Sequence, residues 1–302
     1  MAHPQIAVFA RLAKGGDAPN RVIFGQATKL SRTMHDIRYN EVRDEIYVAN
    51  PFAQAILTFK GDAKGAEAPI RIIQGPKTLL GSEDTLEVDA VHGEILVPQG
   101  DGVLVFPVAA SGDVAPIRHL QRPTPNPGWS IGGGIAVDPI HNLIATDGTL
   151  SGDLAKQYPP INMAPGGRDA YRGGRDTILI FDRTANGETM PLRVIRGQKT
   201  GIYANRQLAL YPKGGWIIVS QITDGGIAIP EDTFVGVWSV FDQGDVPPRW
   251  RIDGKASNIM LKPRGVTYNE KHKEIIVSDM RLNSVLTFSL PEMFNEVAQP
   301  PR

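Results

Sequence analysis

The chain has 302 residues, of which 41% are hydrophobic and 21% are charged, a composition that supplies a substantial globular core. Lys plus Arg and Asp plus Glu each number 32, so no overall charge would recruit nucleic acid or an anionic membrane surface. The absence of cysteine excludes disulfides, thiolate metal sites and a cysteine nucleophile.

The start of the chain and its apolar runs bear on its compartment. No apolar run approaches the roughly 18 residues that span a bilayer, so no membrane span is expected. Met1-Ala-His-Pro4 lacks the charged and then apolar segments of a secretory signal. We therefore expect either a cytoplasmic protein, or a periplasmic or extracellular one from which a signal peptide has been removed.

An internal repeat is the strongest signal in the sequence, because a repeat decides the architecture before single motifs are weighed. Runs of β-formers that end in phenylalanine recur along the chain, at Phe9, Phe59, Phe106, Phe181, Phe241 and Phe288. A second type of run starts with Pro-x-Arg at Pro19, Pro69, Pro116 and Pro191, and a fifth copy at Pro248 has Trp250 in the arginine position. The third type is a hairpin with a charged turn, which covers residues 36–50, 85–99, 134–147, 207–221 and 265–279.

These segments follow one another in a fixed order. Each hairpin supplies two strands, a and b, and is followed by a phenylalanine strand c and, except after the last hairpin, by a Pro-x-Arg strand d. Four short strands per repeat, none able to bury itself alone, are the signature of a β-propeller blade. The predicted fold is therefore all-β, a β-propeller of four-stranded antiparallel blades.

The strand count sets the number of blades. Five hairpins, five d strands and six c strands predict five blades, with six as the alternative. Because the chain starts with strands c and d and ends with a, b and c, the N-terminal strands would complete the C-terminal blade and close the ring. We expect one propeller domain over residues 5–295 and a tail over residues 296–302.

The blades resemble those of NHL-type propellers. The NHL pattern consists of Pro-x-Gly-Ile-Ala-Val-Asp, a Val-x-Asp corner and an Ile-x-Val-Phe strand. It is matched by Lys262-Pro-Arg-Gly-Val-Thr-Tyr268, Ser278-Asp279 and Ser284-Val-Leu-Thr-Phe288, and by Gly134-Ile-Ala-Val-Asp138. The resemblance extends over nearly the whole chain. It implies the architecture and no particular activity.

Two repeats carry inserts between strands b and c, over residues 148–175 and 222–234. In a four-stranded meander the b-to-c and d-to-a connections lie on one face, so both inserts would lie on the same face. Insertions on one face of a repeat array often mark its binding face. The first insert is basic and aromatic through Tyr158, Arg168, Tyr171, Arg172 and Arg175.

The same face would bring together polar residues that differ between the repeats. The residues that lead into strand a are His35, Asp84, Gly133, Arg206 and Arg264, followed by Asp36, Thr85, Gly134, Gln207 and Gly265. Strand b ends at Asn50, Gln99, Asp147, Gln221 and Asp279. Around a propeller axis, guanidinium groups suit carboxylate or phosphate, and an imidazole between acids suits a base or a metal ligand.

Structural alternatives stand beside these interpretations. Polar residues at the end of strand b can be turn formers that bond the local backbone, and neighbouring arginines and aspartates can neutralise one another. Arg38 and Glu87 occupy equivalent hairpin positions, which favours a salt bridge between blades. The Pro-x-Arg arginines would guard an outer strand, and His92 and His141 in hairpin turns are expected to be solvated.

The sequence leaves three functions open. The first is a binding or interaction propeller that recognises a small anionic ligand or a protein segment at the axis. Its ligand-binding candidates are His35, Asp84, Arg206, Gln207, Arg264, Tyr158, Arg168, Tyr171 and Arg172. Another is a structural subunit, a homo-oligomer whose inserts form the interface.

The remaining function is a metal-dependent hydrolase or lyase at the same axial opening. It is suggested by a resemblance to propeller lactonases of the gluconolactonase and paraoxonase kind. Its catalytic candidates are His35, Asp36 and Asp84, and its metal candidates for a divalent cation such as calcium are Asp36, Asn50, Asp84 and Asp147. Arginines stand close to where such a cation would bind, which departs from the family pattern. No other cofactor is evident in the sequence.

Overall fold

The computed structural model describes residues 4–32, 34, 36–82, 85–161, 175–222, 233–258 and 260–300. Contacts divide the chain into two compact units, Met1–Val97 with Leu104–Arg118, and Pro98–Val103 with His119–Arg302. The single domain over residues 5–295 stays a prediction. In the described ranges no helix is long and apolar enough to cross a membrane.

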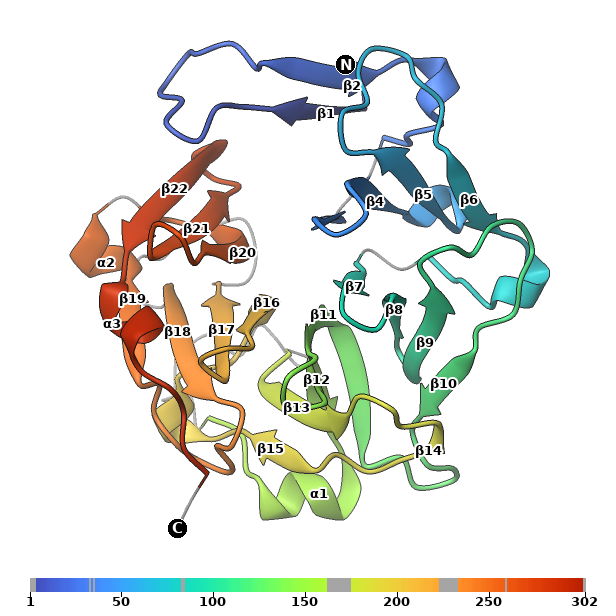
Figure 1. The fold of residues 1–302 in the computed structure, drawn as a ribbon. Helices are drawn as coiled ribbons and strands as arrows, with labels where there is room; N and C mark the ends of the chain where they lie inside the picture. The colour runs from blue at the N-terminus through green and yellow to red at the C-terminus, as the bar shows by residue number, and fades with distance from the viewer. Residues whose placement is uncertain are drawn as a thin grey trace. The chain divides into compact units, whose positions relative to one another are not determined.

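The first part of the chain forms antiparallel sheets (Figure 1). A two-stranded sheet consists of β1 (Gln5–Val8) and β2 (Arg21–Phe24). A four-stranded sheet follows, in the order β3 (Asp36–Asn40), β4 (Glu45–Asn50), β5 (Ala55–Lys60) and β6 (Arg71–Gln74). The next sheet has the order β7 (Glu87–Asp89), β8 (Glu94–Gln99), β9 (Gly102–Pro107), β10 (Arg118–Gln121) and β14 (Gly187–Glu188), with β14 parallel to β10.

The second unit repeats this strand order. One sheet consists of β11 (Trp129–Asp138), β12 (Leu143–Leu150), β13 (Thr177–Asp182) and β15 (Arg193–Ile195). Another consists of β16 (Asn205–Tyr211), β17 (Trp216–Gln221), β18 (Phe234–Ser239) and β19 (Trp250–Asp253). The last has β20 (Pro263–Asn269), β21 (Glu274–Asp279) and β22 (Ser284–Ser289). Within the described ranges, the short helices α1 (Gly152–Gln157), α2 (Gly254–Ser257) and α3 (Pro291–Asn295) lie between or after these strands.

The predicted class, an all-β propeller of five blades, is confirmed. Four sheets contain the full a-b-c-d order, and a fifth, β20-β21-β22, contains a, b and c. As expected from Pro-x-Arg, β2, β6, β10 and β15 each start at the arginine. Closure of the ring by the N-terminal strands stays a prediction, because β1 and β2 pair with each other as a separate sheet among the described strands.

The phenylalanine strands supply much of the core. Phe59, Phe106 and Phe181 are fully buried, and the strands before them are apolar on both faces. Burying such a side chain contributes about 1.5 to 3 kcal/mol, which explains why one aromatic position recurs in strand c. Phe241 and Phe288 are half-buried, and Phe9 is 50% exposed at the end of the two-stranded sheet.

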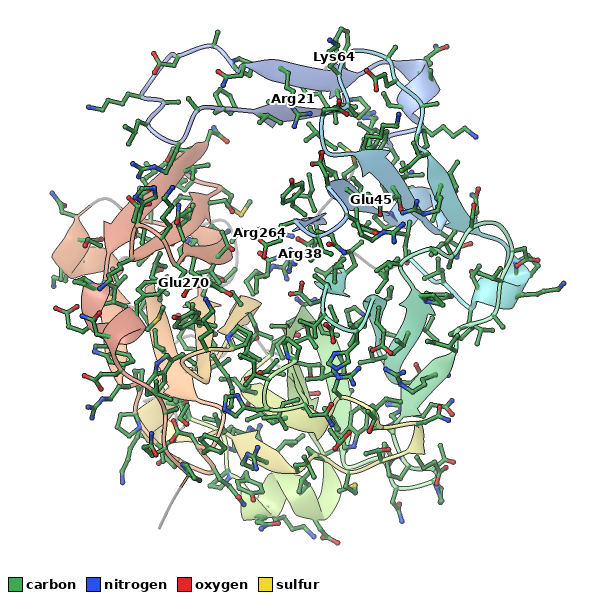
Figure 2. The ribbon with its side chains drawn as sticks, in the orientation of Figure 1. Arg21, Arg38, Glu45, Lys64, Arg264 and Glu270 are labelled. Atoms are coloured by element: carbon green, nitrogen blue, oxygen red, sulfur yellow. The ribbon has the colours of Figure 1, made fainter. Side chains whose placement is uncertain are left out.

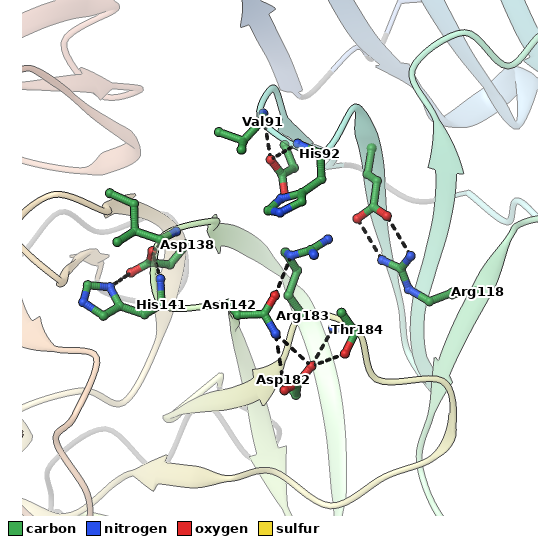
Figure 3. Close-up of polar contacts among 12 residues, drawn as sticks. Val91, His92, Arg118, Asp138, His141, Asn142, Asp182, Arg183 and Thr184 are labelled. Carbon is green, nitrogen blue, oxygen red and sulfur yellow. Dashed lines mark hydrogen bonds and ion pairs between the residues drawn. The ribbon is translucent and has the colours of Figure 1, made fainter.

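The Pro-x-Arg arginines have structural partners, as expected for the outer strands. Arg71 Nη2 donates to Glu45 Oε2 at 2.5 Å. Arg118 donates to both carboxylate oxygens of Glu94 at 2.7 and 2.8 Å (Figure 3). Burial raises the pKa of Glu45, but hydrogen bonds from Arg71 and two other donors outweigh it and hold this pKa at about 2. These guanidinium groups therefore join strand d to the start of strand b.

The hairpin histidines are held more firmly than expected. In one turn, His92 Nδ1 lies 2.7 Å from Asp89 Oδ2, and the other oxygen of Asp89 accepts two backbone N–H groups of the turn (Figure 3). The turn of His141 repeats this arrangement with Asp138, also at 2.7 Å. Both aspartate side chains are fully buried while the histidines are 35% and 25% exposed. These histidines are therefore part of the hairpin turns rather than freely solvated.

A glycine followed by aspartate connects one blade to the outer strand of the preceding blade. In the first unit, Gly112 N donates to Ile72 O at 2.6 Å and Gln74 N donates to Gly112 O at 3.2 Å. Asp113 Oδ1 then accepts the N–H of Lys77 at 2.7 Å, in the turn after β6. We call this arrangement the Gly-Asp bridge.

The second unit contains the same Gly-Asp bridge between β15 and the loop before β19. Gly244 N donates to Val194 O at 2.7 Å, and Arg196 N donates to Gly244 O at 3.1 Å. Asp245 Oδ1 accepts Lys199 N at 2.5 Å. The residue before this turn must be glycine, because Gly197 has a φ of 139° and a Cβ there would lie 2.5 Å from Asp245 Cγ.

We predict that Asp245→Ala lowers the free energy of unfolding by about 1 to 2 kcal/mol, because it leaves the Lys199 N–H and the preceding turn without their acceptor. Urea unfolding followed by tryptophan fluorescence measures this change. Asp17→Ala is the matched control, since Asp17 accepts only from Lys14 of its own exposed turn among the contacts described. Equal stability of the two variants would contradict the structural role of the bridge.

Candidate functional site

Polar side chains at the end of strand b bond to the backbone that leads into strand a of the same blade. Asn50 Oδ1 accepts from Ser31 N at 3.2 Å, and Gln221 Oε1 accepts from Tyr203 N and Ala204 N at 3.1 Å. The structural interpretation of these residues therefore holds for both. The equivalent Gln99 is also buried, and its Nε2 has no partner among the residues that the structure describes.

Asp279 and Asp147 act in the same way with carboxylates. Asp279 Oδ2 accepts from Leu261 N and Lys262 N at 2.7 Å, and its other oxygen accepts two N–H groups of the following turn. Asp147 is fully buried, and its Oδ1 accepts from Gly133 N and Gly134 N, both at 2.7 Å. Because an unpaired buried carboxylate is costly, these backbone segments are fixed in place.

The backbone opposite these acceptors bulges. In β16 the pairing with β17 skips from Asn205 to Gln207, so Arg206 is an extra residue, and in β20 it skips from Pro263 to Gly265, so Arg264 is an extra residue. In β11 the three residues 132–134 lie opposite the single residue Asp147, so two of them are extra. Bulges re-aim side chains and are frequent next to functional sites. The residues that the sequence singled out before strand a are thus the bulge residues of the second unit.

Two of the three glycines in the bulge of β11 lie against a side chain from the end of the first insert. A Cβ on Gly133 would lie 3.2 Å from both terminal nitrogens of Arg175, and a Cβ on Gly132 would lie 2.7 Å from Arg175 Cδ. The guanidinium group of Arg175 approaches Asp147, with Nε 3.4 Å from Oδ2. Glycine at these positions therefore makes room for Arg175.

Asn205 joins Arg175 to the neighbouring blade. Its backbone N–H donates to the Arg175 carbonyl at 3.0 Å. With its amide nitrogen facing Asp147, Asn205 donates to Asp147 Oδ2 at 3.1 Å. Burial raises the pKa of Asp147 to about 6, although Arg175, the two glycine N–H groups and Arg206 act to lower it.

Arg206 and Arg264 lie on adjacent backbone segments. Ser220 Oγ is 3.3 Å from both the Gln207 carbonyl and the Arg264 carbonyl, so the bulges of β16 and β20 lie on either side of one hydroxyl. A Cβ on Gly265 would lie 2.8 Å from Gln207 Oε1. Arg264 projects from β20 (Figure 2), and one of its terminal nitrogens lies 3.9 Å from Met280 Sδ. We refer to Arg175, Arg206 and Arg264 as the arginine cluster.

The first unit places Asp36 in an ion-pair network. Arg38 pairs with Asp36, and Arg38 Nε lies 3.2 Å from Glu87 Oε1, which confirms the predicted salt bridge between these hairpins. Leu86 N donates to Asp36 Oδ2 at 3.3 Å. Burial raises the pKa of Asp36 and of Glu87. Burial would lower the pKa of Arg38, but the two carboxylates raise it.

Several predicted site residues lie outside the described residues: His35, Asp84, Arg168, Tyr171 and Arg172. Of the described ones, Arg206, Gln207 and Arg264 lie on two adjacent strands, and their role in ligand binding stays a prediction. Tyr158 lies elsewhere in the second unit, where its carbonyl accepts from Arg196 Nη1 and its hydroxyl accepts from Gln243 Nε2, both at 2.8 Å. The sequence pattern does not single out Asn205, and it marks Arg175 only as part of a basic insert.

The metal candidates among the described residues bond to other groups. Asp36 faces Arg38, Asp147 faces Arg175 and two N–H groups, and the Asn50 amide bonds to the backbone at both ends. Over the described ranges, no group of three or more His, Asp or Glu residues could hold a metal ion. These contacts do not favour a divalent cation, and the metal site stays a prediction that elemental analysis tests.

Comparison with known proteins adds the fold and no activity. No family model matches the chain, and no curated protein matches it. Among solved structures, hydrazine synthase from Kuenenia stuttgartiensis is similar, with a TM-score of 0.51 and 12% sequence identity over 82% of this chain. The chain spans 56% of the length of that protein.

This similarity shows the fold alone. Matches to solved structures number 582 chains, as expected for an architecture that hosts many unrelated functions. The NHL resemblance of the blades stays a prediction. A propeller is a general scaffold for binding, and any specific function has to be argued from the residues of the site.

We predict a pH-dependent contribution of Asp147 to stability. Burial raises the pKa of Asp147 from 3.8 in the unfolded chain to about 6 in the folded protein. The contribution of Asp147 to the free energy of unfolding is therefore complete below pH 3.8 and is lost as the pH rises through about 6. Relative to Asp147→Asn, the wild-type free energy of unfolding should fall by about 2 to 3 kcal/mol between pH 3.5 and 7.5. Urea unfolding across this range measures it, and parallel pH curves for the two proteins would contradict it.

Proposed function

We propose that this protein is a binding propeller that takes up a small anionic ligand at the arginine cluster. The observation that carries the proposal is the charge at the bulges of the second unit. Arg206 and Arg264 are the extra residues of two bulges, and Arg175 lies against the third bulge, where its Nε is 3.4 Å from the buried carboxylate of Asp147.

The acids next to the arginine cluster are committed to other donors. Asp279 accepts four backbone N–H groups. Asp176 accepts from Arg196 Nε at 2.9 Å and Nη2 at 2.5 Å. These contacts leave Asp147 as the carboxylate that faces Arg175 among the residues described. An incoming oxyanion would therefore join Asp147 as a second acceptor for the guanidinium group of Arg175.

The exposure of the arginines supports a ligand from solvent. The Arg175 side chain is 26% exposed, and Arg206 and Arg264 are half-buried. Partial burial strengthens charge-assisted hydrogen bonds, because water and salt screen them less. Guanidinium groups also present planar pairs of donors that match carboxylate and phosphate oxygens. A small carboxylate or phosphate fits this chemistry better than a cation does.

We predict that Arg206→Ala combined with Arg264→Ala lowers the affinity for citrate at least tenfold. Each lost charge-assisted hydrogen bond is worth about 1.5 to 3 kcal/mol, and 1.4 kcal/mol is tenfold in affinity. Isothermal titration calorimetry on the purified chain measures the affinity. The thermal midpoint of the double variant, measured beside that of the wild type, shows whether the variant still folds.

The control for a general charge effect is Arg249→Ala. Arg249 is exposed in the same unit and pairs with Glu296 at 3.0 Å. Its loss should leave citrate affinity unchanged. Two results would overturn the proposal: no citrate or phosphate binding by the wild type, or equal affinities of the double variant and the wild type.

A further inference from the structure

The three bulges of the second unit differ in which residue brings an arginine side chain to them. In β16 and β20 the extra residue is itself an arginine. In β11 the equivalent residue is Gly133, which has no side chain, and both terminal nitrogens of Arg175 lie 3.2 Å from the position that its Cβ would take. A residue from a different segment thus brings a guanidinium group to this bulge.

Two contacts hold Arg175 at this place, one to its backbone carbonyl and one to its side chain. The Asn205 N–H donates to the Arg175 carbonyl at 3.0 Å, and Asn205 immediately precedes Arg206. On the other side, Asp147 Oδ2 lies 3.4 Å from Arg175 Nε. The side chain is therefore ordered before a ligand arrives, which reduces the entropic cost of binding.

From this geometry we infer that Arg175 is a third ligand-binding residue of the arginine cluster, and that the ligand is a multivalent oxyanion with two or more carboxylate groups. The inference rests on the proposed function and adds the residue and the ligand class. Three consecutive blades thus each have an arginine at the bulge of strand a, from the bulge itself in two of them and from the first insert in the other. One carboxylate can engage one or two of these groups, whereas a di- or tricarboxylate can engage all three.

Asp147 fits this role as the internal partner of Arg175. It keeps Arg175 in position and leaves part of the guanidinium group for another acceptor, since Asp147 contacts its Nε side. Arginine has five N–H donors in a fixed fork, so a second carboxylate can bind its terminal nitrogens while Nε faces Asp147. Those terminal nitrogens are the atoms that lie over Gly133.

The test measures the affinities of citrate, malonate and acetate for the purified chain by isothermal titration calorimetry. These ligands carry three, two and one carboxylate groups. We expect wild-type affinity to rise with the number of carboxylates. Arg175→Ala should lower citrate affinity at least tenfold and acetate affinity less than twofold, and Arg175→Lys should recover part of the loss.

A second variant moves Arg175 without removing any charge. Gly133→Ala places a methyl group against the terminal nitrogens of Arg175, so it should also lower citrate affinity, by about threefold to tenfold. Gly100→Ala is its matched control, because a Cβ on Gly100 meets no atom within 4 Å. Thermal midpoints of all variants identify any that fail to fold, and Gly133→Ala keeps the test valid if Arg175→Ala is one of them.

The outcomes separate this inference from the proposed function. If Arg175→Ala and Gly133→Ala bind citrate as the wild type does, while the Arg206 and Arg264 double variant does not, the inference is wrong and the proposed function stands. If acetate and citrate bind equally well to the wild type, the multivalent ligand class is wrong. If the wild type binds none of the three, both the function and the inference fall.

Discussion

A buried acceptor at the end of strand b needs donors, and the structure around the candidate site follows from that need. Leaving such a carboxylate or amide unpaired would cost about 1 to 3 kcal/mol or more. The nearest donors are the backbone N–H groups that lead into strand a of the same blade, as Gly133 and Gly134 show for Asp147. In the second unit the backbone meets this demand by departing from regular pairing, and the extra residue is turned away from the ladder. The acceptor is therefore structural, and the residue that it displaces is available for function.

The outer strands are held by a different interaction, which also satisfies backbone groups that would otherwise lack a partner. A short d strand would leave one edge unpaired, which is a site for unwanted strand addition. In the Gly-Asp bridge, the glycine bonds to this edge and the aspartate caps the turn that follows. In one connection Gly187 pairs with Leu120, and Glu188 accepts from Thr124, so a longer acid takes the place of aspartate. Inner acceptors and outer bridges therefore fix the inner and outer edges of the blades in which they occur.

Much of the fold could be predicted from the sequence because its causes are local and repeated. Phenylalanine at the end of strand c and Pro-x-Arg at the start of strand d each reflect one requirement, core packing or edge protection, that every blade has. The salt bridge of Arg38 with Glu87 was predictable for the same reason, since the two residues are equivalent in successive hairpins. Positions where repeats agree therefore reveal scaffold.

The role of Arg175 could not be predicted in this way, because it depends on a contact between segments that the repeat does not relate. The sequence did contain a signal, since three consecutive glycines before strand a are unusual where other blades have charged residues. Read alone, Gly132-Gly133-Gly134 suggests a flexible turn, but the structure shows glycine required by close approach of Asp147 and Arg175. The absence of a side chain at a repeated position is therefore itself information. It indicates that another part of the chain fills that space, and the filling group, a guanidinium at the end of the first insert, has the same chemistry as the residues at the equivalent positions of the next two blades.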